Sequence, residues 1–420
     1  MSRLHVAILD EELPYPLTSG KRIRTYQLLS KLAERHRLTY LCHRNPDPVE
    51  SEQAEQAMGD LDIRTIVVDR PVPRKSGIGF YVRLAGNLLS SLPYSVTTHR
   101  SEALLNAARQ IAADDPPDLW HCEWTPYAET LRHLPAARSV VMAHNVESLI
   151  WQRYAETEAN PLKRWYIRQQ QRKYERFERW AYSACNCAIA VSEPDARLMR
   201  ERFGVERVAV VDNGVDTTFF APDPNTARDP LKLLFLGSLD WRPNLDAVRI
   251  LIESIFPQVL SGEPRATLDI VGRRPPEWLQ REAAKIPGIV IYADVADVRP
   301  FLHRAGMMVV PLRIGGGSRL KILEALATGL PVVSTSVGAE GLELDPLSDM
   351  RVTDGDEAMT QSILDWMNDH HSAAKSAARG RQVVLDRYDW EGLALQLESN
   401  WIETAGVTIP LQNSCALSAV

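Results

Sequence analysis

A run of glycines followed by two cations is the segment of this 420-residue chain best suited to bind an anion. The glycines occupy positions 315–317, Ser318 comes next, and Arg319 and Lys321 lie at the start of a predicted helix over 319–328. Glycines let a backbone approach a ligand closely, and the free N–H groups of a helix N-terminus favour phosphate. Cations in a first helical turn oppose the helix dipole unless an anion is bound there. The segment predicts a phosphate site, with a glycine loop beside two solvated cations as the alternative.

Polar side chains that follow two further predicted strands are candidates for binding or catalysis. Ligands of parallel α/β sheets bind at the carboxyl ends of the strands. A single histidine in such a place is more often structural, so the spacing by itself leaves both roles open. The residues concerned are His144 and Asn145, after a strand at 140–143, and Glu123 and Trp124, after a strand at 119–122.

Short apolar runs alternate with helical patterns along most of the chain. Strands that alternate with helices indicate βαβ units and a parallel sheet with right-handed crossovers. The predicted strands are 4–9, 38–42, 63–68, 119–122, 140–143 and 188–191 in the first half, and 208–211, 231–236, 266–271, 290–292, 307–311 and 331–334 in the second.

The division of the chain follows from a linker pattern near its middle. Asn213-Gly214 and the Pro-, Asp- and Asn-rich segment 222–230 are typical of a connection between domains. We predict a first domain over 1–205 and a second over 206–388. A C-terminal helix over 389–406 is predicted to return to the first domain, and 407–420 to form a flexible tail.

Composition excludes several classes of protein. Hydrophobic residues make up 45% and charged residues 24%, as in an ordinary globular chain. The net charge of −6 argues against nucleic-acid binding. The five cysteines form no CxxC pair, so we expect no zinc site, no disulfide framework and a cytoplasmic location. No apolar run is long enough for a signal peptide or a membrane span.

Residues 323–341, LEALATGLPVVSTSVGAEG, are similar to the signature LEAMA-x-G-x-PVV-x-T-x-x-G-x-x-E of the retaining glycosyltransferases of family four. The segments LFLGSLDWRPNLD (234–246), AVSEPDARLMRERFG (190–204) and VVDNGVDTTFFAP (210–222) extend the resemblance over most of the chain. It implies the α/β GT-B fold, in which two Rossmann-like parallel-sheet domains face each other across a cleft. Bacterial sugar transferases for exopolysaccharides are the most similar members.

The resemblance also implies roles for single residues. Glu324 matches the glutamate that holds the ribose hydroxyls, and His144 matches a histidine that reaches toward the transferred sugar. Gly20 matches a glycine of the first loop, for which a plain helix-entry turn is the alternative. With the backbone near Asp294 and Val295 expected to contact the base, the implied donor-binding residues are Gly20, Gly237, Ser238, Arg242, Asp294, Val295, Gly316, Gly317, Ser318, Arg319, Lys321 and Glu324. The catalytic candidates are His144, Arg319 and Lys321, and the acceptor-side candidates are Glu123, Trp124 and Asn145.

The chain departs from the family pattern at the diphosphate site. Gly316 stands where the family has the first glutamate of its E-x7-E motif, and Gly237-Ser238 stands where Gly-Arg is common. We therefore predict that Arg319 and Lys321 supply the charge that neutralises the diphosphate. Arg242 is a weaker candidate for the same role.

The implied activity is transfer of a sugar from a nucleoside diphosphate-sugar to a hydroxyl acceptor, with retention and without a metal. A lipid-linked saccharide is one candidate acceptor. Two alternatives remain: a nucleotide-sugar epimerase of the same fold, and a catalytically degenerate partner that only binds nucleotide-sugars. The D-x-D pairs at Asp60/Asp62 and Asp354/Asp356 are no more than chance gives in a chain of this composition, so no metal or other cofactor is predicted.

A basic, aromatic helix is predicted over Pro161–Tyr182. Such a helix can lie on an anionic membrane surface, for example the cytoplasmic face of an inner membrane, with Lys163, Arg164, Arg168, Arg172 and Lys173 toward the lipid. The alternative is an amphipathic helix that packs its aromatic residues into the domain. The apolar segment 78–92 is a second candidate for membrane contact.

Overall fold

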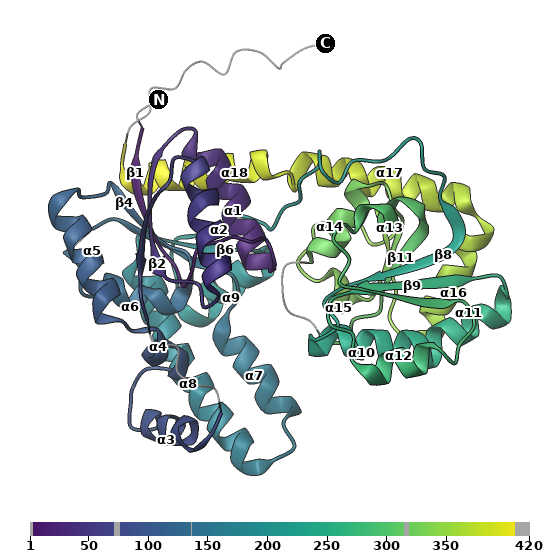
Figure 1. The fold of residues 1–420 in the computed structure, drawn as a ribbon, viewed down its shortest axis with the longest axis horizontal. Helices are drawn as coiled ribbons and strands as arrows, with labels where there is room; N and C mark the ends of the chain where they lie inside the picture. Colours follow the sequence, from purple (N-terminus) through teal and green to yellow (C-terminus); the bar gives the residue numbers. More distant parts are fainter. Residues whose placement is uncertain (1–2, 71–75, 136, 315–318, 408–420) are drawn as a thin grey trace, which may run out of the picture. The chain divides into compact units, whose positions relative to one another are not determined.

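A computed structural model describes residues 3–70, 76–135, 137–314 and 319–407. The predicted tail from residue 408 onward, and Gly316, Gly317 and Ser318, lie outside the described residues. The chain divides into two compact units, one of Met1–Asp212 with Ala394–Val420 and the other of Asn213–Leu393. Each unit is built on one parallel sheet with helices on its faces (Figure 1).

The sheet of the first unit has seven strands in the described part of the chain, in the order β3-β2-β1-β4-β5-β6-β7. Neighbouring strands pair in parallel throughout. The central strands are buried along their length, as apolar runs without alternation predict. The strands are β1 (His5–Leu9), β2 (Arg37–His43), β3 (Arg64–Val68), β4 (Leu119–Cys122), β5 (Ser139–Ala143), β6 (Cys187–Ala190) and β7 (Val208–Val210).

Capping residues set where the helices of the first unit begin. The Ser19 side chain accepts a hydrogen bond from the Arg22 N–H at the start of α1, and Asn160 caps α8 in the same way. The helices are α1 (Gly20–Ala33), α2 (Pro48–Asp60), α3 (Ile78–Asn87), α4 (Tyr94–His99), α5 (Glu102–Asp114), η1 (Thr125–Tyr127), α6 (Ala128–Leu131), α7 (Glu147–Thr157), α8 (Pro161–Ala184), α9 (Glu193–Phe203) and α18 (Trp390–Ala405).

The second unit has a six-stranded parallel sheet in its described residues, ordered β10-β9-β8-β11-β12-β13. Its strands are β8 (Asp229–Leu236), β9 (Thr267–Gly272), β10 (Ile289–Ala293), β11 (Ala305–Val310), β12 (Val332–Ser334) and β13 (Arg351–Val352). Its helices are α10 (Arg242–Ile250), the π-helical turn η2 (Leu251–Ile255), α11 (Phe256–Gly262), α12 (Glu277–Ala283), α13 (Arg299–Arg304), α14 (Leu320–Ala327), α15 (Ser336–Ala339), α16 (Asp356–Asn368) and α17 (His370–Arg387).

The strand predicted at 208–211 belongs to the first sheet and not to the second. Its residues form β7, which pairs with β6 from Ala188↔Val208 to Ala190↔Val210. The first unit accordingly runs to Asp212, beyond the predicted boundary at residue 205. An apolar run of this length predicts a strand, but only the neighbouring strand that satisfies its backbone groups decides which sheet it joins.

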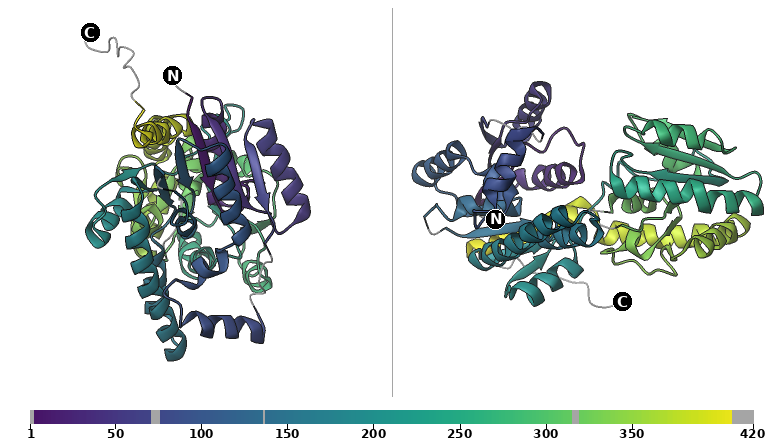
Figure 2. Two further views of the ribbon diagram at one scale, coloured as in Figure 1. Left: turned by 90° about the vertical axis from the view of Figure 1, so that its left-hand side faces the viewer. Right: turned by 90° about the horizontal axis from the view of Figure 1, so that it is seen from below.

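The C-terminal helix α18 joins the first unit from Ala394 onward. Trp401 is fully buried, and Glu398 contacts the guanidinium of Arg35 at 2.9 Å and the His36 ring at 3.0 Å. The left view of Figure 2 shows this helix beside the N-terminal strands. Residues far apart in the sequence therefore share one core.

Each sheet has a topological switch point, where the chain leaves two adjacent strands in opposite directions. In the first unit β1 leads to β2 on one side and β4 leads to β5 on the other. In the second unit β8 and β11 stand in the same relation. Ligands of open α/β sheets bind at the carboxyl ends of such strand pairs, so the two switch points are where a site is expected.

Candidate active site

Lys321 lies at the switch point of the second unit, beside the loop that follows β8. Its ammonium donates a hydrogen bond of 2.8 Å to Oδ1 of Asn244, and the Asn244 amide donates to the Ser238 carbonyl at 2.9 Å. A Cβ atom on Gly237 would lie 2.8 Å from the Lys321 nitrogen, so only glycine leaves room for this cation. The first turn of α14 thus brings a positive charge to the first loop of the unit.

The environment of Lys321 lowers the pKa of its ammonium group. Burial lowers the pKa of the ammonium to about 8, and the nearby Arg319 guanidinium acts in the same direction. The ring of Phe235 lies 4.9 Å below the nitrogen. A cation held in a partly desolvated place interacts strongly with an anion that comes to it.

Glu324 lies one helical turn after Lys321 on α14. Burial raises the pKa of its carboxyl to about 7, and Lys321 only partly offsets this. Among the described residues no side chain donates a hydrogen bond to this carboxylate. It is therefore available to accept hydrogen bonds from a ligand, as the predicted ribose contact requires.

Arg319 differs from its predicted position. The helix begins at Leu320, so Arg319 is the N-cap residue and not part of the first turn, and its φ of 51° lies in the left-handed region. The side chain is only 7% exposed and contacts Glu340, with Nη2 3.3 Å from Oε2 and Nε 3.3 Å from the carbonyl. The contact with Glu340 joins this end of α14 to the residues that follow α15.

The other predicted donor residues are spread along the same edge of the sheet. Arg242 is exposed at the first position of α10, and the Ser238 hydroxyl donates to Asp240 at 2.7 Å. Asp294 has a left-handed φ of 50° and accepts a hydrogen bond from the Arg274 N–H, while Val295 packs against the core.

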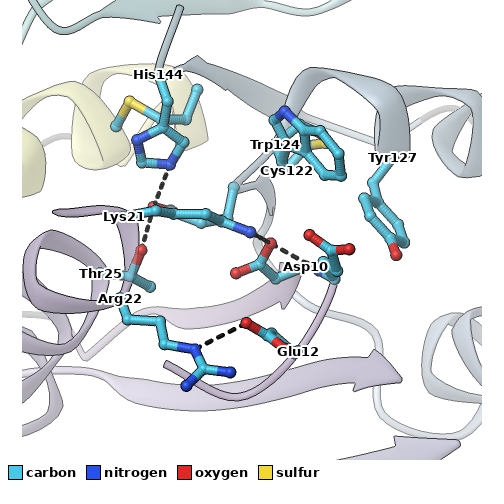
Figure 3. A network of polar contacts seen from close by, with 12 residues as sticks. Asp10, Glu12, Lys21, Arg22, Thr25, Cys122, Trp124, Tyr127 and His144 are labelled. Atoms are coloured by element: carbon cyan, nitrogen blue, oxygen red, sulfur yellow. Dashed lines mark hydrogen bonds and ion pairs between the residues drawn. The ribbon is translucent and has the colours of Figure 1, made fainter. Parts of the chain in front are cut away.

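A second cluster lies at the switch point of the first unit (Figure 3). Glu123, directly after β4, is only 3% exposed. Its Oε1 accepts from the Thr25 hydroxyl at 2.7 Å and from Nε2 of His144 at 3.1 Å, and its Oε2 accepts from Nε2 of His121 at 2.7 Å. Burial alone would raise the pKa of Glu123, but the hydrogen bonds from the two histidines outweigh it and hold the pKa well below its usual range.

The structure thus brings two predicted site residues, Glu123 and His144, into contact. The His144 side chain, just past β5, remains 11% exposed. Glu123 itself is buried, and its carboxylate is occupied by hydrogen bonds from three side chains.

Of the remaining predicted residues in this unit, Trp124 donates to the carboxylate of Glu147 at 3.2 Å. Asn145 is half-buried just before α7, and Gly20 is the first residue of α1.

Sequence reasoning missed several residues at both switch points. Lys21 forms an ion pair with the buried Asp10 after β1, and its nitrogen lies 5.3 Å from the centre of the Trp124 ring. Thr25, one turn further along α1, reaches Glu123. The sequence did hold a signal for them: Lys21 and Thr25 are four residues apart and so share one face of the helix, which comes after an aspartate, Asp10, at the end of a strand. For Asn244 there was no such signal.

No group of three or more His, Cys, Asp or Glu side chains that could hold a metal ion occurs within the described ranges. Asp354 of the second D-x-D pair accepts a hydrogen bond of 2.9 Å from the Ser336 N–H at the start of α15. That aspartate has a structural partner.

Two family models match the chain in succession. A model described as Glycosyltransferase Family 4 matches residues 19–219, and one described as Glycosyl transferases group 1 matches residues 230–369. They correspond to the two sheets in chain order.

Two curated relatives match part of their length. One, a subunit of the phosphatidylinositol N-acetylglucosaminyltransferase of Homo sapiens, is 25% identical over 159 residues, which cover 36% of this chain and 31% of that protein. The GDP-mannose-dependent alpha-(1-6)-phosphatidylinositol monomannoside mannosyltransferase of Mycolicibacterium smegmatis is 31% identical over 199 residues, or 42% of this chain and 51% of that protein. The match thus spans a third to a half of these relatives' length.

Among solved structures, sucrose-phosphate synthase from Thermosynechococcus elongatus superposes with a TM-score of 0.71 at 18% identity, over 97% of this chain and 100% of that one. This likeness shows the fold. With the two family matches, it establishes that the chain belongs to the glycosyltransferases of the GT-B fold, with a family 4 domain followed by a group 1 domain.

Proposed function

We propose that the chain transfers a sugar, with retention, from a nucleoside diphosphate-sugar to a hydroxyl acceptor in the synthesis of an exopolysaccharide or glycoconjugate. The observation that carries the proposal is the pairing on α14 of a partly desolvated cation with an available carboxylate, Lys321 and Glu324. A nucleoside diphosphate offers a diphosphate and ribose hydroxyls to these two groups. One curated relative is named as GDP-mannose-dependent, which supports this class of donor.

The chemistry asked of these residues is stabilisation of charge. As the bond between sugar and diphosphate breaks, negative charge grows on the phosphate oxygens. Lys321 and Arg319 are held in place by Asn244 and Glu340, so they meet that charge without reorganising. Glu324 anchors the ribose, and the leaving phosphate oxygen takes the proton of the acceptor hydroxyl.

A thermal-shift screen with nucleoside diphosphates and their sugars tests the donor class, because a ligand that binds the folded state raises the melting temperature. Incubation with the best donor should then release free nucleoside diphosphate. Binding without release would identify a nucleotide-sugar-binding partner instead. Interconversion of the donor without release would identify an epimerase.

The pH dependence of donor binding should show a maximum between the pKa values of the two α14 groups. Affinity should rise as the pH rises through about 7, where Glu324 ionises and can accept from the ribose. It should fall as the pH rises through about 8, where Lys321 loses its proton. Calorimetry with a nucleotide-sugar, whose own phosphates do not titrate in this range, measures the curve.

Two variants test the rise and the fall of donor affinity with pH separately. Glu324→Gln should remove the rise at lower pH, and Lys321→Arg should remove the fall at higher pH because guanidinium keeps its proton. An affinity that stays constant from about pH 6 to about pH 9 would contradict both assignments.

Transfer should not depend on a divalent metal, because cationic side chains are expected to take the role that a metal has in other transferases. Turnover measured with EDTA should equal turnover with added Mg²⁺ or Mn²⁺. Loss of activity on chelation, restored by one of these ions, would refute this expectation.

Peripheral membrane contact, and with it a lipid-linked acceptor, is a further part of the proposal. None of the described helices is long and apolar enough to cross a membrane. The first turns of α8 expose Leu162 and Trp165, at 78% and 52%, among basic residues. The neighbouring α3 exposes Ile78, Tyr81 and Val82. Apolar side chains beside cations suit an anionic membrane on the cytoplasmic side.

One of the five basic residues predicted to face the lipid, Lys173, is not exposed. Lys173 is buried and its ammonium contacts Asn87 at the end of α3. Tyr174 and Phe177 are also buried, so the second half of α8 packs into the unit. The contacts of Lys173 and Gln170 with Asn87 join the end of α3 to α8, and Figure 1 shows both helices at the same end of the first unit.

The wild-type protein should co-sediment with anionic vesicles, and reversal of the exposed α8 charges should abolish this. Each of the exposed Lys163, Arg168 and Arg172, and the half-buried Arg164, is expected to contribute about 1 kcal/mol near an anionic surface. The matched control reverses Lys375 and Arg379, which are exposed on α17 of the other unit. A wild type that never sediments would leave α8 a structural helix.

A further inference from the structure

We propose that Trp401, His121 and Glu123 form a relay that positions His144, so that the C-terminal helix α18 takes part in the site of the first unit. The inference rests on the proposed function, because His144 is taken as the residue that meets the sugar. The other three act through His144 and are positioning residues.

The relay begins at the indole N–H of Trp401, which can donate a hydrogen bond but cannot accept one. The indole N–H of Trp401 lies 2.9 Å from Nδ1 of His121, and both residues are buried. An indole nitrogen only donates, so Nδ1 of His121 must accept and the ring carries its proton on Nε2. That proton points to Oε2 of Glu123, 2.7 Å away.

Glu123 in turn fixes the orientation of the His144 ring. A carboxylate with a lowered pKa only accepts hydrogen bonds, so Nε2 of His144, 3.1 Å from Oε1, must donate. The His144 ring is therefore held with Nε2 toward Glu123 and Nδ1 away from it. No described residue forms a hydrogen bond with Nδ1 of His144. This nitrogen is the atom left to accept from a sugar hydroxyl.

The tertiary fold brings the members of the relay together from three places in the chain. His121 lies in β4, Glu123 directly follows it, His144 follows β5 and Trp401 belongs to α18. Glu398 holds α18 in register through its contacts with Arg35 and His36. A displacement of α18 would therefore reach His144 through three hydrogen bonds.

Nitrogen NMR of ¹⁵N-histidine-labelled full-length protein reads the state of His144, because ring ¹⁵N shifts report which nitrogen carries the proton. The His144 signals are assigned with His144→Gln. In Trp401→Phe, Nδ1 of His121 loses the donor that fixes the tautomer of the ring, so Nε2 of His121 no longer has to donate to Oε2 of Glu123. The carboxylate is then no longer held in the orientation that fixes His144. We expect the share of His144 rings with the proton on Nε2 to fall.

A double-variant cycle tests the order of the relay. His121→Phe should change the His144 signals in the same direction, and the combined Trp401→Phe/His121→Phe protein should show no greater change than His121→Phe alone. A thermal melt of each variant checks the fold, because His121→Phe also leaves the buried Oε2 of Glu123 without its donor. Additive changes would overturn the relay.

Trp366→Phe is the matched control. Trp366 is 3% exposed, and its indole nitrogen has no hydrogen-bond partner among the described residues. This variant loses the same atoms from a buried place, yet the His144 signals should stay as in the wild type. Unchanged His144 signals in a folded Trp401→Phe protein would show that Trp401 only packs, and would overturn the proposal.

Kinetics give a second readout. Trp401→Phe should lower kcat by about tenfold, the effect of one buried hydrogen bond left unmade, while the calorimetric affinity for the nucleoside diphosphate stays the same. A loss confined to nucleotide affinity would count against the relay. Altered His144 signals in a protein that transfers no sugar would support the relay and refute the proposed function, so the two failures are distinguishable.

Discussion

Lys321→Met should lower kcat/KM by a factor of about 10² to 10³, as loss of one preorganised charge stabiliser does. The ammonium is the cation that α14 brings to the loop after β8, where Gly237 leaves space for it and Asn244 holds it. Methionine keeps most of the apolar stem but can neither donate nor carry charge. Steady-state kinetics with saturating acceptor measures the effect.

Two further variants make this result specific. Lys285→Met removes an ammonium that is 66% exposed and paired with Glu282, and should be silent. Lys321→Arg keeps the charge but not the shape beside Gly237, and should recover only part of the activity. Equal activity of Lys321→Met and the wild type would remove Lys321 from the diphosphate site.

Arg319→Ala should reduce kcat/KM by about 10², while Arg242→Ala should have a much smaller effect. The Arg319 guanidinium is almost buried at the start of α14, whereas Arg242 is exposed at the start of α10. A positioned cation stabilises growing charge more than one that water screens. Alanine keeps the Cβ atom, so the left-handed backbone of residue 319 is no more strained than before.

The contact with Glu340 supplies the control for that comparison. Glu340→Gln removes a negative charge 3.3 Å from the guanidinium but leaves an oxygen to hold it, so activity should be retained. Arg319→Ala also loses this contact, and a thermal melt will show whether the fold is affected. If Arg242→Ala abolishes transfer and Arg319→Ala is nearly silent, the diphosphate charge is met from the loop after β8 instead.

Local patterns were sufficient to predict the architecture. Apolar runs without alternation predicted buried parallel strands, and β1, β4 and β5 lie within a residue or two of where the runs stand. The GT-B fold and the glycosyltransferase family followed from motifs such as 323–341, because their residues are close together in the chain. Such features depend on backbone preferences and burial within a few neighbouring residues, which a single sequence displays.

The sites required the tertiary structure. The sequence named Glu123 as an acceptor contact, but the fold buries it among Thr25, His121 and His144, and Trp401 reaches the same network from the other end of the chain. Lys321 was a candidate by type, yet its place beside Gly237 depends on Asn244, 77 residues earlier.

The sequence by itself therefore determined most of the strands, though not β13 (Arg351–Val352), and with them the family and the kinds of group available for chemistry. Only the tertiary structure decided which sheet β7 joins, that Arg319 is a cap, and which side chains share a hydrogen bond. The physical reason is that a hydrogen bond or a pKa shift depends on atoms a few ångströms away in space, whatever their separation along the chain.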